Sequence, residues 1–547
     1  MASIRLQIAL TCTLALGALV ACSGEDVRAP RPESSSPGES HTVAPWAADA
    51  NGGTLFDHVA EEARRRASSP YRAPDHALVA AAADLDYAAY RDIRFRDERA
   101  IWHGAAPFEV QLFHPGGGSD VPVRIHLVED GASRPLDFDE SLFDYGELAQ
   151  GALETSPSGP PPEVGYAGFR VLATMNEPTK MDEVAAFLGA SYFRLVGPSH
   201  VYGLSSRGLA VDIAESGGEE FPDFVGFWLV RPEADADALT FYGLLDSPSV
   251  AGAYRFDLRP GTSLDVSARL FFREDVAKVG IAPLTSMYLH SPTIPGGHDD
   301  FRPRVHDSEG LAMLTSKGEW VWRPLTNGRG VRVTSLRDVD PAGFGLVQRT
   351  RDFDEYLDLE ARYHRRPSVW VDIDESWGGG GVELLEIPTT SEFNDNVVAY
   401  WVPDGDPVAG DTLSVRYRLV TFDSALGSTD GLPVRRVAAV ARTSIGWDAL
   451  PGEAEPPPRS RRRVVVDFEG GGLPSLSPSE TVTASLSVSS GTTTDVRVEV
   501  LPNGGRRATF SLEPDGERGA DMRLFLVHTD TVVSETWSYL WDPSLVR

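Results

Sequence analysis

The sequence VELLEIPTTSEFNDNVVAYW, residues 382–401, predicts two strands joined by a turn. Apolar residues dominate both ends, while Pro, Thr, Ser and Asn gather between them, as is typical of a connection between strands. Two acidic side chains, Glu392 and Asp395, lie in this connection. Carboxylates on a loop held by strands are candidates for acid–base chemistry. The alternative is that Asp395, with an asparagine on each side, only forms the turn, because Asx side chains bond their own backbone there.

Strand-like patterns recur on both sides of this stretch. Short alternating or apolar runs bounded by Gly, Pro, Asp and Asn include VPVRIHLV from Val121, FRLVG from Phe193, GLAVDIA from Gly208 and LTFYGLL from Leu239. Period-two alternation at this spacing indicates sheets. Helical patterns are brief and are expected at residues 56–66, in DEVAAFLG from Asp182 and in FDEYLDLEARY from Phe353. The sequence therefore predicts a mostly β protein.

The chain changes character after Phe422. A polar, Gly-containing stretch and PGEAEPPPRSRRR from Pro451 precede a series of short strand patterns such as RRVVVDFEG and TVTASLSVSS. About seven short strands in this part suit a small Ig-like sandwich. We therefore expect one domain over residues 54–425 and a second over residues 434–547. The run Arg459–Arg463 is a candidate basic patch, with a solvated hairpin loop as the alternative.

Composition limits the class of protein and of partner. A chain of 547 residues exceeds one ordinary core, so two domains or one very large one are expected. Its 41% of hydrophobic residues is typical of a globular protein, and its net charge is -30. That charge excludes nucleic acids and anionic membrane surfaces as partners, because both are polyanions that the protein would repel. A neutral ligand meets no such repulsion.

The N-terminus predicts export. Arg5 precedes an apolar run, Ile8–Val20, which is too short to span a bilayer as a helix. The run ends in Leu-Val-Ala-Cys22, which resembles a bacterial lipobox, so we expect a signal peptide over residues 1–21 and lipidation of Cys22. The alternative is ordinary cleavage beside a chance cysteine. Because Cys12 lies in the removed segment, the mature protein would hold no second thiol for a disulfide.

Residues 22–53 are expected to form a flexible tether. They are rich in Ser, Pro, Gly, Ala and acids and have no apolar periodicity, so they bury too little surface to offset their ordering entropy. Ser23 rather than aspartate follows the cysteine, which under the usual proteobacterial sorting pattern sends a lipoprotein to the outer membrane. The expected location is therefore the periplasmic face of that membrane, with the lipid as the sole membrane contact.

Motifs along the chain resemble those of the periplasmic glucan biosynthesis proteins G and D, the MdoG/OpgG/OpgD-like family of osmoregulated glucan metabolism. The stretch at residues 382–401 matches the family's EIPT and NDN–VAYW motifs. Further matching segments are LGASYFR from Leu188, VYGLSSRGLA from Val201, GEEFP from Gly218, LLDSPSVAGAY from Leu244, APLTSM from Ala282, RPRVHDSEGL from Arg302, GEWVWRPL from Gly318, GFGLVQRTRDF from Gly343 and SETWSY from Ser534. The resemblance to this family rests on the number of these segments and on their order along the chain.

The resemblance implies a fold and an activity. The family has a large N-terminal β-sandwich of the galactose mutarotase-like, or supersandwich, type and a smaller C-terminal Ig-like domain. Its members include inverting endo-β-1,2-glucanases, in which the aspartate of NDN is the general acid and that of HDS the general base. These positions are Asp395 and Asp307 here. The implied partners are linear β-1,2-glucan and the inner-membrane glucan glucosyltransferase, and the alternative is a non-catalytic glucan-binding factor that assists synthesis.

Both carboxyls have requirements that the sequence does not test. Asp307 by itself also reads as an N-cap or turn residue before Gly310. An inverting enzyme needs its carboxyls about 6.5 to 9.5 Å apart, or further with a relay through a substrate hydroxyl and water. The general acid also needs a raised pKa, from burial or a nearby negative charge. Glu392, three residues before Asp395, is the expected source of that charge.

Other chemistries are less well supported. A cluster of possible ligands invites a metal site, but two glycines precede it and no spacing such as HExxH appears. The cluster is His298, Asp299, Asp300 and His306. The stretch GLSSRG from Gly203 lacks the G-x-S-x-G order of a serine hydrolase. We expect no metal and no other cofactor.

Sugar recognition needs flat apolar faces and polar groups beside them, which nominates a set of aromatic and charged residues for the cleft. The set is Glu392, Trp320, Trp322, Arg323, Tyr202, Arg207, Tyr288 and Arg351. Alternation along a strand places Trp320 and Trp322 on the same face, so core packing is the alternative for both.

Overall fold

The computed structural model describes residues 54–74, 85–116, 121–154, 165–293, 299–423, 432–450, 452, 454–516 and 518–545. The expected signal peptide, Cys22 and the tether over residues 22–53 lie outside the described residues. Within the described ranges, no helix is both long enough and apolar enough to cross a membrane.

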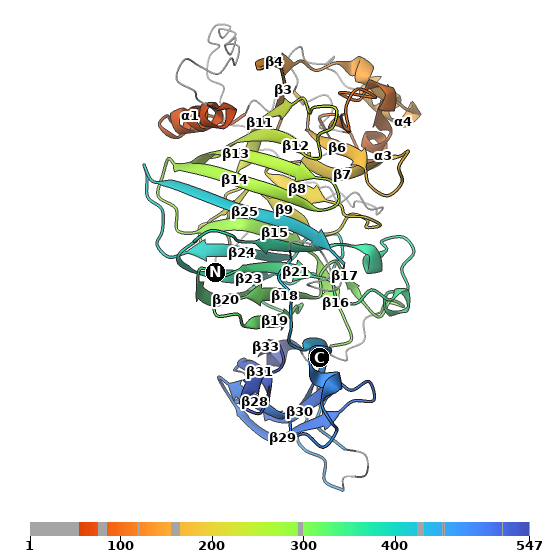
Figure 1. Cartoon of the computed structure of the whole chain (residues 1–547), viewed down its shortest axis with the longest axis vertical. Helices are drawn as coiled ribbons and strands as arrows, with labels where there is room; N and C mark the ends of the chain where they lie inside the picture. Colours follow the sequence, from red (N-terminus) through yellow and green to blue (C-terminus); the bar gives the residue numbers. More distant parts are fainter. Residues whose placement is uncertain are drawn as a thin grey trace.

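The protein is mostly β, as the alternation predicted, and its strands form two large sheets (Figure 1). The first sheet contains, in spatial order, β2 (Phe108–Phe113), β6 (Gly168–Thr174), β7 (Met181–Leu188), β8 (Tyr192–Leu195), β9 (Ser205–Arg207), β15 (Val279–Ser286), β24 (Val397–Pro403), β23 (Gly379–Glu386) and β20 (Arg332–Val339), and β10 (Leu209–Val211) also pairs with β15. The stretch quoted first is the β23–β24 hairpin, paired from Gly380 with Pro403 to Glu386 with Val397.

The second sheet is longer and continues to the C-terminus. Its spatial order is β28 (Thr483–Val488), β31 (Ala520–His528), β33 (Thr536–Trp541), β19 (Trp320–Pro324), β18 (Gly310–Leu314), β21 (Gly343–Val347), β22 (Ser368–Asp372), β25 (Thr412–Phe422), β14 (Ser263–Phe272), β13 (Val250–Arg259), β12 (Leu239–Asp246), β11 (Asp223–Val230), β3 (Arg124–Glu129) and β4 (Ala132–Leu136), with β32 (Thr531–Val532) beside β31.

The two large sheets pack face to face around an aromatic core. Phe169 of β6 meets Phe227 of β11 edge to face with ring centroids 5.0 Å apart, and Phe187 of β7 meets Phe241 of β12 in the same way at 5.1 Å. Aromatic pairs in this geometry add about 0.5–1.5 kcal/mol beyond their burial. This core fixes the sandwich whose edges carry the loops described below.

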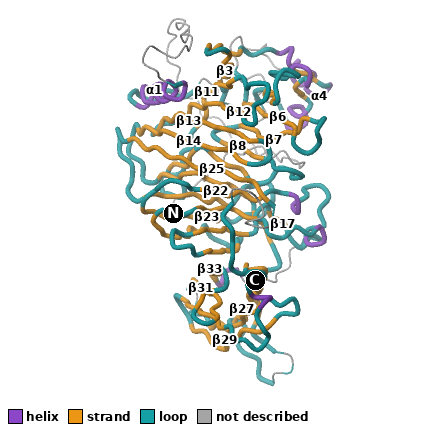
Figure 2. The backbone as a smooth tube through the Cα atoms, in the orientation of Figure 1, coloured by secondary structure: helices purple, strands orange, loops and turns teal. Residues whose placement is uncertain are grey.

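Helices lie at the periphery of the sandwich (Figure 2). The helix expected at residues 56–66 is confirmed as α1 (Leu55–Ala67), which Thr54 and Asp57 cap reciprocally. Its buried face packs on the outer side of β12 and β13. The smaller elements near it in sequence are α3 (Tyr87–Arg91), β1 (Ile93–Phe95), η2 (Asp97–Arg99), η3 (Glu140–Leu142), β5 (Phe143–Tyr145) and α4 (Glu147–Glu154).

Two helix predictions are wrong. The segment from Asp182 is strand β7, because pairing with β6 and β8 buries Val184, Ala185 and Phe187 in the core, and such packing overrides local propensity. The segment from Phe353 forms only the short turns η4 (Phe353–Glu355) and η5 (Tyr363–Arg365). Between them the carboxylate of Asp358 accepts the backbone N–H groups of residues 360 and 361, a local bonding pattern that competes with a helix.

The C-terminal strands form a smaller sandwich that shares a sheet with the large one. Its second sheet contains β26 (Ala439–Trp447), β27 (Arg462–Glu469), β30 (Arg506–Glu513) and β29 (Thr492–Val500), and η6 (Leu473–Ser475) and η7 (Pro543–Leu545) are its short turns. Strand β33 runs parallel to β19, with Val321 opposite Thr536 and Trp322 opposite Trp537. The C-terminal sandwich is therefore joined to the large one by hydrogen bonds between strands and not by a linker alone (Figure 1).

The arginine run beside Pro451 lies in the β26–β27 hairpin. Arg461 and Arg463 both bind the buried carboxylate of Asp448, at 2.8 and 2.7 Å. Arg459 lies over the ring of Trp447 at 3.7 Å. These contacts fit the hairpin alternative, because they use three of the arginines to close the loop.

A buried ion cluster also joins the two sandwiches. Glu535, which is 0% exposed, accepts two bonds from Arg349 at 2.7 and 2.9 Å, one from Arg435 at 3.0 Å and one from the backbone of Val440 at 2.8 Å. Burial alone would raise the pKa of Glu535, but the two arginines outweigh it and hold the pKa below its ordinary value. The carboxylate is therefore charged, and its loss would leave two buried guanidinium groups without their partner.

We expect Glu535→Ala to lower the free energy of unfolding by about 3–5 kcal/mol, because one partner of a buried charge network is removed. The measurement is urea unfolding of the wild type and the variant. The control is Asp515→Ala, which breaks only the exposed pair with Arg518 and should cost less than about 1 kcal/mol. Equal losses for the two variants would contradict a stabilising role of the cluster.

Candidate functional site

Asp307 directly follows a short strand that lies beside the first sheet. Strand β17 (Val305–His306) pairs with β16 (Tyr288–His290), which continues from β15. The backbone N–H of Asp307 donates to the carbonyl of Met287 at 2.8 Å, and Ser286 Oγ donates to Ser308 Oγ at 2.8 Å. The side chain of Asp307 is buried. Residues 286–288 thus hold Asp307 from one side.

The same three residues hold the Asp395 loop through Asn396. The Asn396 amide accepts the backbone N–H of Tyr288 at 2.8 Å and donates to the carbonyls of Tyr288 at 3.1 Å and Ile387 at 2.9 Å. Its backbone N–H donates to the carbonyl of Ser286 at 3.0 Å. Asn396 is therefore the turn-forming residue. Within the described part of the chain, no group donates a hydrogen bond to the carboxylate of Asp395.

Both aspartates therefore attach to one backbone segment, Ser286–Tyr288, from two loops that are far apart in sequence. Burial raises the pKa of Asp307, and the charge of Asp395 raises it further. Burial also raises the pKa of Asp395 above its ordinary value, although its side chain is only half-buried. Since the charge of Asp395 acts on Asp307, the two carboxyls lie within electrostatic reach of each other.

Arg366 opposes these shifts and distinguishes the two carboxyls. Its buried guanidinium donates to Asp307 directly and to the carbonyl of Ala361 at 3.1 Å, and it lies over the ring of Tyr363 at 4.3 Å. It acts on Asp395 only through its charge, as do Arg194 and Arg207. Asp307 thus has a cation in contact, whereas Asp395 has none, and this favours ionisation of Asp307 before Asp395.

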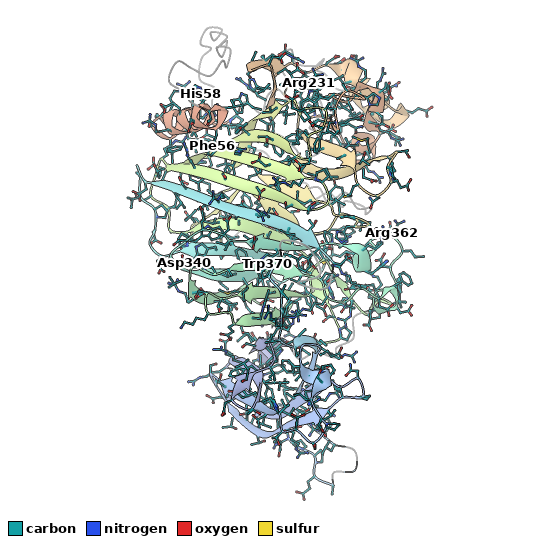
Figure 3. All side chains as sticks on the ribbon, viewed as in Figure 1. Phe56, His58, Arg231, Asp340, Arg362 and Trp370 are labelled. Atoms are coloured by element: carbon teal, nitrogen blue, oxygen red, sulfur yellow. The ribbon has the colours of Figure 1, made fainter. Side chains whose placement is uncertain are left out.

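Arg302 fastens three loops beside the pair. Its guanidinium binds Asp300, Asp358 and Glu392, each with at least one N–O distance of 2.8 Å. The hydroxyl of Tyr363 also donates to Glu392 at 2.6 Å. These loops lie on the side of the sandwich where Arg362 is labelled in Figure 3. The cluster fixes the loop of Asp395 against the loop of Arg366.

The expected role of Glu392 as the charge that raises the pKa of Asp395 is wrong. Arg302 pairs with Glu392 at 2.8 Å, and burial, not Glu392, raises the pKa of Asp395. Sequence spacing suggested proximity along the loop but gave no sign of the compensating arginine. Arg302 and Arg366 were missed because nothing in their spacing separates them from the other arginines, and only the fold brings them to the aspartates.

Four residues that the sequence nominated for the sugar cleft have different positions around the pair. They are Arg207, Tyr288, Tyr202 and Arg351. Arg207 is buried against Tyr192 and bonded to Glu219 at 2.6 Å, and its charge acts on Asp395. Tyr288 is buried and stacks on His306 with centroids 5.3 Å apart. The hydroxyl of Tyr202 donates to Glu183, and burial raises its pKa strongly.

Arg351 supports the Arg366 loop rather than facing a ligand. Its guanidinium donates to the carbonyl of Arg366, to Ser368 Oγ at 3.2 Å and to the carbonyl of Asp423 at 3.0 Å. A planar group that donates to several acceptors at once fixes the backbone around it. Arg351 therefore positions the residue that contacts Asp307.

Trp320, Trp322 and Arg323 are not brought to the pair. Both tryptophans lie in the buried cluster that β19 shares with the C-terminal sandwich, where Trp320 packs on Trp370 and Arg349 lies over Trp322 at 3.5 Å. Arg323 points to the opposite face of β19 and bonds Thr334 and Ser538 at 2.8 and 3.1 Å. The tryptophans follow the core-packing alternative, so we leave all three residues out of the site.

Two of the four candidate metal ligands, Asp300 and His306, are bonded to other side chains. His298 lies outside the described residues, and the described ones contain no group of three or more His, Cys, Asp or Glu side chains arranged for a metal ion. Asp300 binds Arg302, and His306 Nδ1 lies 2.9 Å from the amide oxygen of Gln348. Burial lowers the pKa of His306 to about 4, so its imidazole is neutral at physiological pH.

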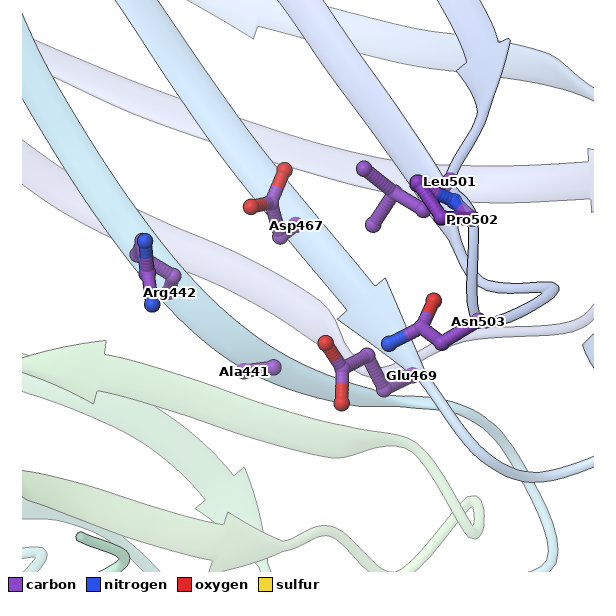
Figure 4. A pocket seen from close by; sticks show the side chains of 7 residues that line it. All are labelled: Ala441, Arg442, Asp467, Glu469, Leu501, Pro502 and Asn503. Carbon is purple, nitrogen blue, oxygen red and sulfur yellow. The ribbon is translucent and has the colours of Figure 1, made fainter.

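A cavity in the C-terminal sandwich is remote from these residues. Figure 4 shows its lining, which encloses about 400 Å³ and contains Asp467 and Glu469. Asp467 is bonded in bidentate fashion to Arg507 at 2.7 and 2.8 Å. Such a pair occupies both oxygens of the carboxylate, which does not suit it to proton donation. The acidic pair of the large sandwich is the better candidate site.

Comparison with known proteins shows the family to which this chain belongs. The family model described as "Periplasmic glucan biosynthesis protein, MdoG" matches residues 55–541. The Glucans biosynthesis protein G of Ralstonia nicotianae is 43% identical over 499 residues, which cover 89% of this chain and 96% of that protein.

Two further relatives carry the same name. That of Pseudomonas aeruginosa is 42% identical over 500 residues, covering 88% of this chain and 92% of the relative. That of Shewanella frigidimarina is 42% identical over 489 residues, covering 89% and 84%. The chain accordingly belongs to the MdoG family of periplasmic glucan biosynthesis proteins and takes part in glucan biosynthesis in the periplasm.

Proposed function

We propose that this protein hydrolyses linear β-1,2-glucan with inversion, as an endo-acting glycoside hydrolase, with Asp395 as general acid and Asp307 as general base. The observation that carries the proposal is the attachment of both aspartates to residues 286–288, with burial raising the pKa of each. Two interacting carboxyls with unequal surroundings are the requirement of acid–base glycoside hydrolysis.

The contacts of each carboxyl support its assigned role. Asp307 meets the guanidinium of Arg366, which favours its ionised form and suits a general base. The carboxylate of Asp395 receives no hydrogen bond from the described residues, and burial favours its protonated form, which suits a general acid. The charges of Arg194 and Arg366 limit the rise of both pKa values.

In the proposed reaction, Asp395 donates its proton to the glycosidic oxygen as the bond from that oxygen to the anomeric carbon breaks. Water attacks this carbon from the opposite face, and its proton passes to Asp307 directly or through a substrate hydroxyl. The new sugar end has inverted configuration. Asp307 then releases its proton to solvent and Asp395 takes one up, which restores the starting state.

The second candidate function is a non-catalytic glucan-binding factor that assists the inner-membrane glucan glucosyltransferase. The relatives are named for glucan biosynthesis, and that name describes a requirement for the product rather than a bond that is cut. This candidate uses the same surface but needs no proton transfer. Binding of the glucan without release of reducing ends would favour it.

We expect Asp395→Asn and Asp307→Asn each to lower the release of reducing ends from linear β-1,2-glucan about 10²- to 10⁴-fold, because each removes a proton-transfer group. The measurement is a reducing-end assay with purified protein, and calorimetry checks that the variants still bind the polymer. Asp406→Asn, at an exposed position, serves as the control and should keep full activity. Full activity in Asp395→Asn, or no product from the wild type, would refute the hydrolase.

The pH dependence of kcat/KM should change when Arg366 is replaced. The rate of the wild type rises with pH as Asp307 ionises and falls as Asp395 loses its proton. Without the guanidinium, burial and Asp395 raise the pKa of Asp307 unopposed, so we expect the acid limb of kcat/KM to move to higher pH in Arg366→Met.

Two variants control for structural damage at this position. Arg366→Lys retains a cation and should restore part of the wild-type profile, and Arg362→Met, at an exposed neighbour, should leave it unchanged. Thermal unfolding of each variant checks its fold. If the acid limb of a folded Arg366→Met coincides with that of the wild type, Asp307 is not the base.

We also propose that Cys22 is lipidated after cleavage and tethers the protein to the periplasmic face of the outer membrane. The support is the Leu-Val-Ala-Cys sequence followed by Ser23 and the polar stretch to residue 53. We expect the mature protein to begin at a diacylglyceryl-modified Cys22, measured by mass spectrometry of the purified native protein. Cys22→Ser should release the protein into the soluble periplasmic fraction, and an unmodified mature N-terminus would contradict the anchor.

A further inference from the structure

We propose that a cavity of mixed polar and apolar lining, between the Asp395 loop and the C-terminal sandwich, is a sugar-binding subsite, which the C-terminal sandwich helps to form. The cavity encloses about 470 Å³, within the roughly 300–1,000 Å³ of small-molecule sites. Its walls come from β16, from residues 325–329, from residues 388–394 and from the C-terminal residues Tyr539 and Ser544. This inference rests on the proposed function and extends it by naming where the polymer continues.

The lining of the cavity suits a neutral polyhydroxy ligand. Its hydroxyl and amide groups include those of Ser291, Thr326, Asn327, Thr390 and Asn394. Beside them lie apolar groups, His290 and the guanidinium-bearing Arg329. None of the described residues that line it carries a carboxylate, in a chain whose net charge is -30. Hydroxyls and amides both donate and accept, as sugar hydroxyls do, whereas a cation would require the acids that are missing here.

A buried hydroxyl in the wall has an unfilled hydrogen bond. Tyr539 is 0% exposed, and its hydroxyl finds no partner among the described residues. Its ring is held by stacking on Trp537, with centroids 5.5 Å apart and the planes at 4°. A buried donor without a partner costs about 1–3 kcal/mol, so the position favours a ligand that supplies one. Tyr539 is among the residues that line the cavity, so the partner that we propose for its hydroxyl is a sugar hydroxyl bound there.

The cavity shares a loop with the acidic pair, although neither Asp395 nor Asp307 is among its lining residues. Asn394, in its wall, directly precedes Asp395, and Tyr288, also in its wall, holds Asn396 through both of its backbone groups. The carboxyl of the proposed acid and the cavity therefore share one loop. A polymer cut at the pair would have neighbouring sugar units within reach of the cavity, whereas a short fragment confined to the pair would not reach it.

This arrangement gives the C-terminal sandwich a part in substrate binding. Tyr539 belongs to β33 and Ser544 to η7, and the pairing of β33 with β19 fixes both against the large sandwich. The buried Glu535 cluster precedes β33 directly and holds the same junction. Without these contacts the wall of the cavity would move with the C-terminal sandwich.

Two variants test the cavity. Tyr539→Phe removes the unpaired hydroxyl and keeps the ring, and Thr390→Leu places an apolar side chain at an exposed lining position. Matched controls make the same changes elsewhere: Tyr417→Phe at another buried unpaired hydroxyl, in the core of the large sandwich, and Thr492→Leu on the exposed side of β29. Thermal unfolding checks that all four variants fold.

The measurements use linear β-1,2-gluco-oligosaccharides of increasing length with the full chain. KM is measured for cleavage, and Kd is measured by calorimetry in the Asp395→Asn background. We expect Tyr539→Phe and Thr390→Leu to raise KM and Kd for long chains about 2- to 10-fold, the range of one lost hydrogen bond. For the shortest chain that is still cut, KM should equal that of the wild type, and the controls should change neither value.

Each outcome separates the subsite from the hydrolase. A wild type that neither binds nor cuts the glucan overturns the proposed function and the subsite together. Normal cleavage with variant KM and Kd values like those of the controls overturns the subsite alone. An effect that is equal for short and long chains also overturns it, because that is the result of structural damage. Binding without cleavage, weakened only for long chains, supports the subsite and refutes the hydrolase.

Discussion

The side-chain amide of Asn396 is the contact on which the site depends. By bonding both backbone groups of Tyr288 and the carbonyl of Ile387, it fixes the end of the β23–β24 connection against the start of β16. Asp395 is therefore held in place by its neighbour, and its own carboxylate does not bond the backbone of the turn. A group that must give up a proton benefits from this arrangement, because a carboxylate that caps backbone N–H groups has a lowered pKa.

Buried charge around the pair is arranged unequally. Burial raises the pKa of both aspartates, Arg366 contacts only Asp307, and Arg302 neutralises Glu392 beside them. Two neighbouring carboxyls, one buried and one half-buried, are costly for the folded state, and such clusters of shifted pKa values are found at functional sites. The three loops that Arg302 joins supply the rigidity that keeps these charges in place.

The C-terminal sandwich is an integral part of this architecture. Strand β33 extends the larger of the two sheets, and Glu535 bonds arginines from both sides of the junction. Trp320 and Trp322 fill the shared core there. A sandwich attached in this way keeps its own residues in fixed register with the loops of the acidic pair, which is the condition for a binding wall made from both.

The sequence by itself determined the β class, the family and a helix at residues 56–66, which the structure shows as Leu55–Ala67. Alternation and turn residues are local signals, and the family motifs are distributed over most of the chain. Local signals failed where packing outweighs propensity, as in β7, and where a residue's role depends on a distant partner, as for Glu392 and Arg302. Only the tertiary structure placed the tryptophans of β19 in the core and joined Asp307 with Arg366. Burial and charge compensation arise between segments that are remote in the chain. The spacing of residues within one segment therefore does not predict them.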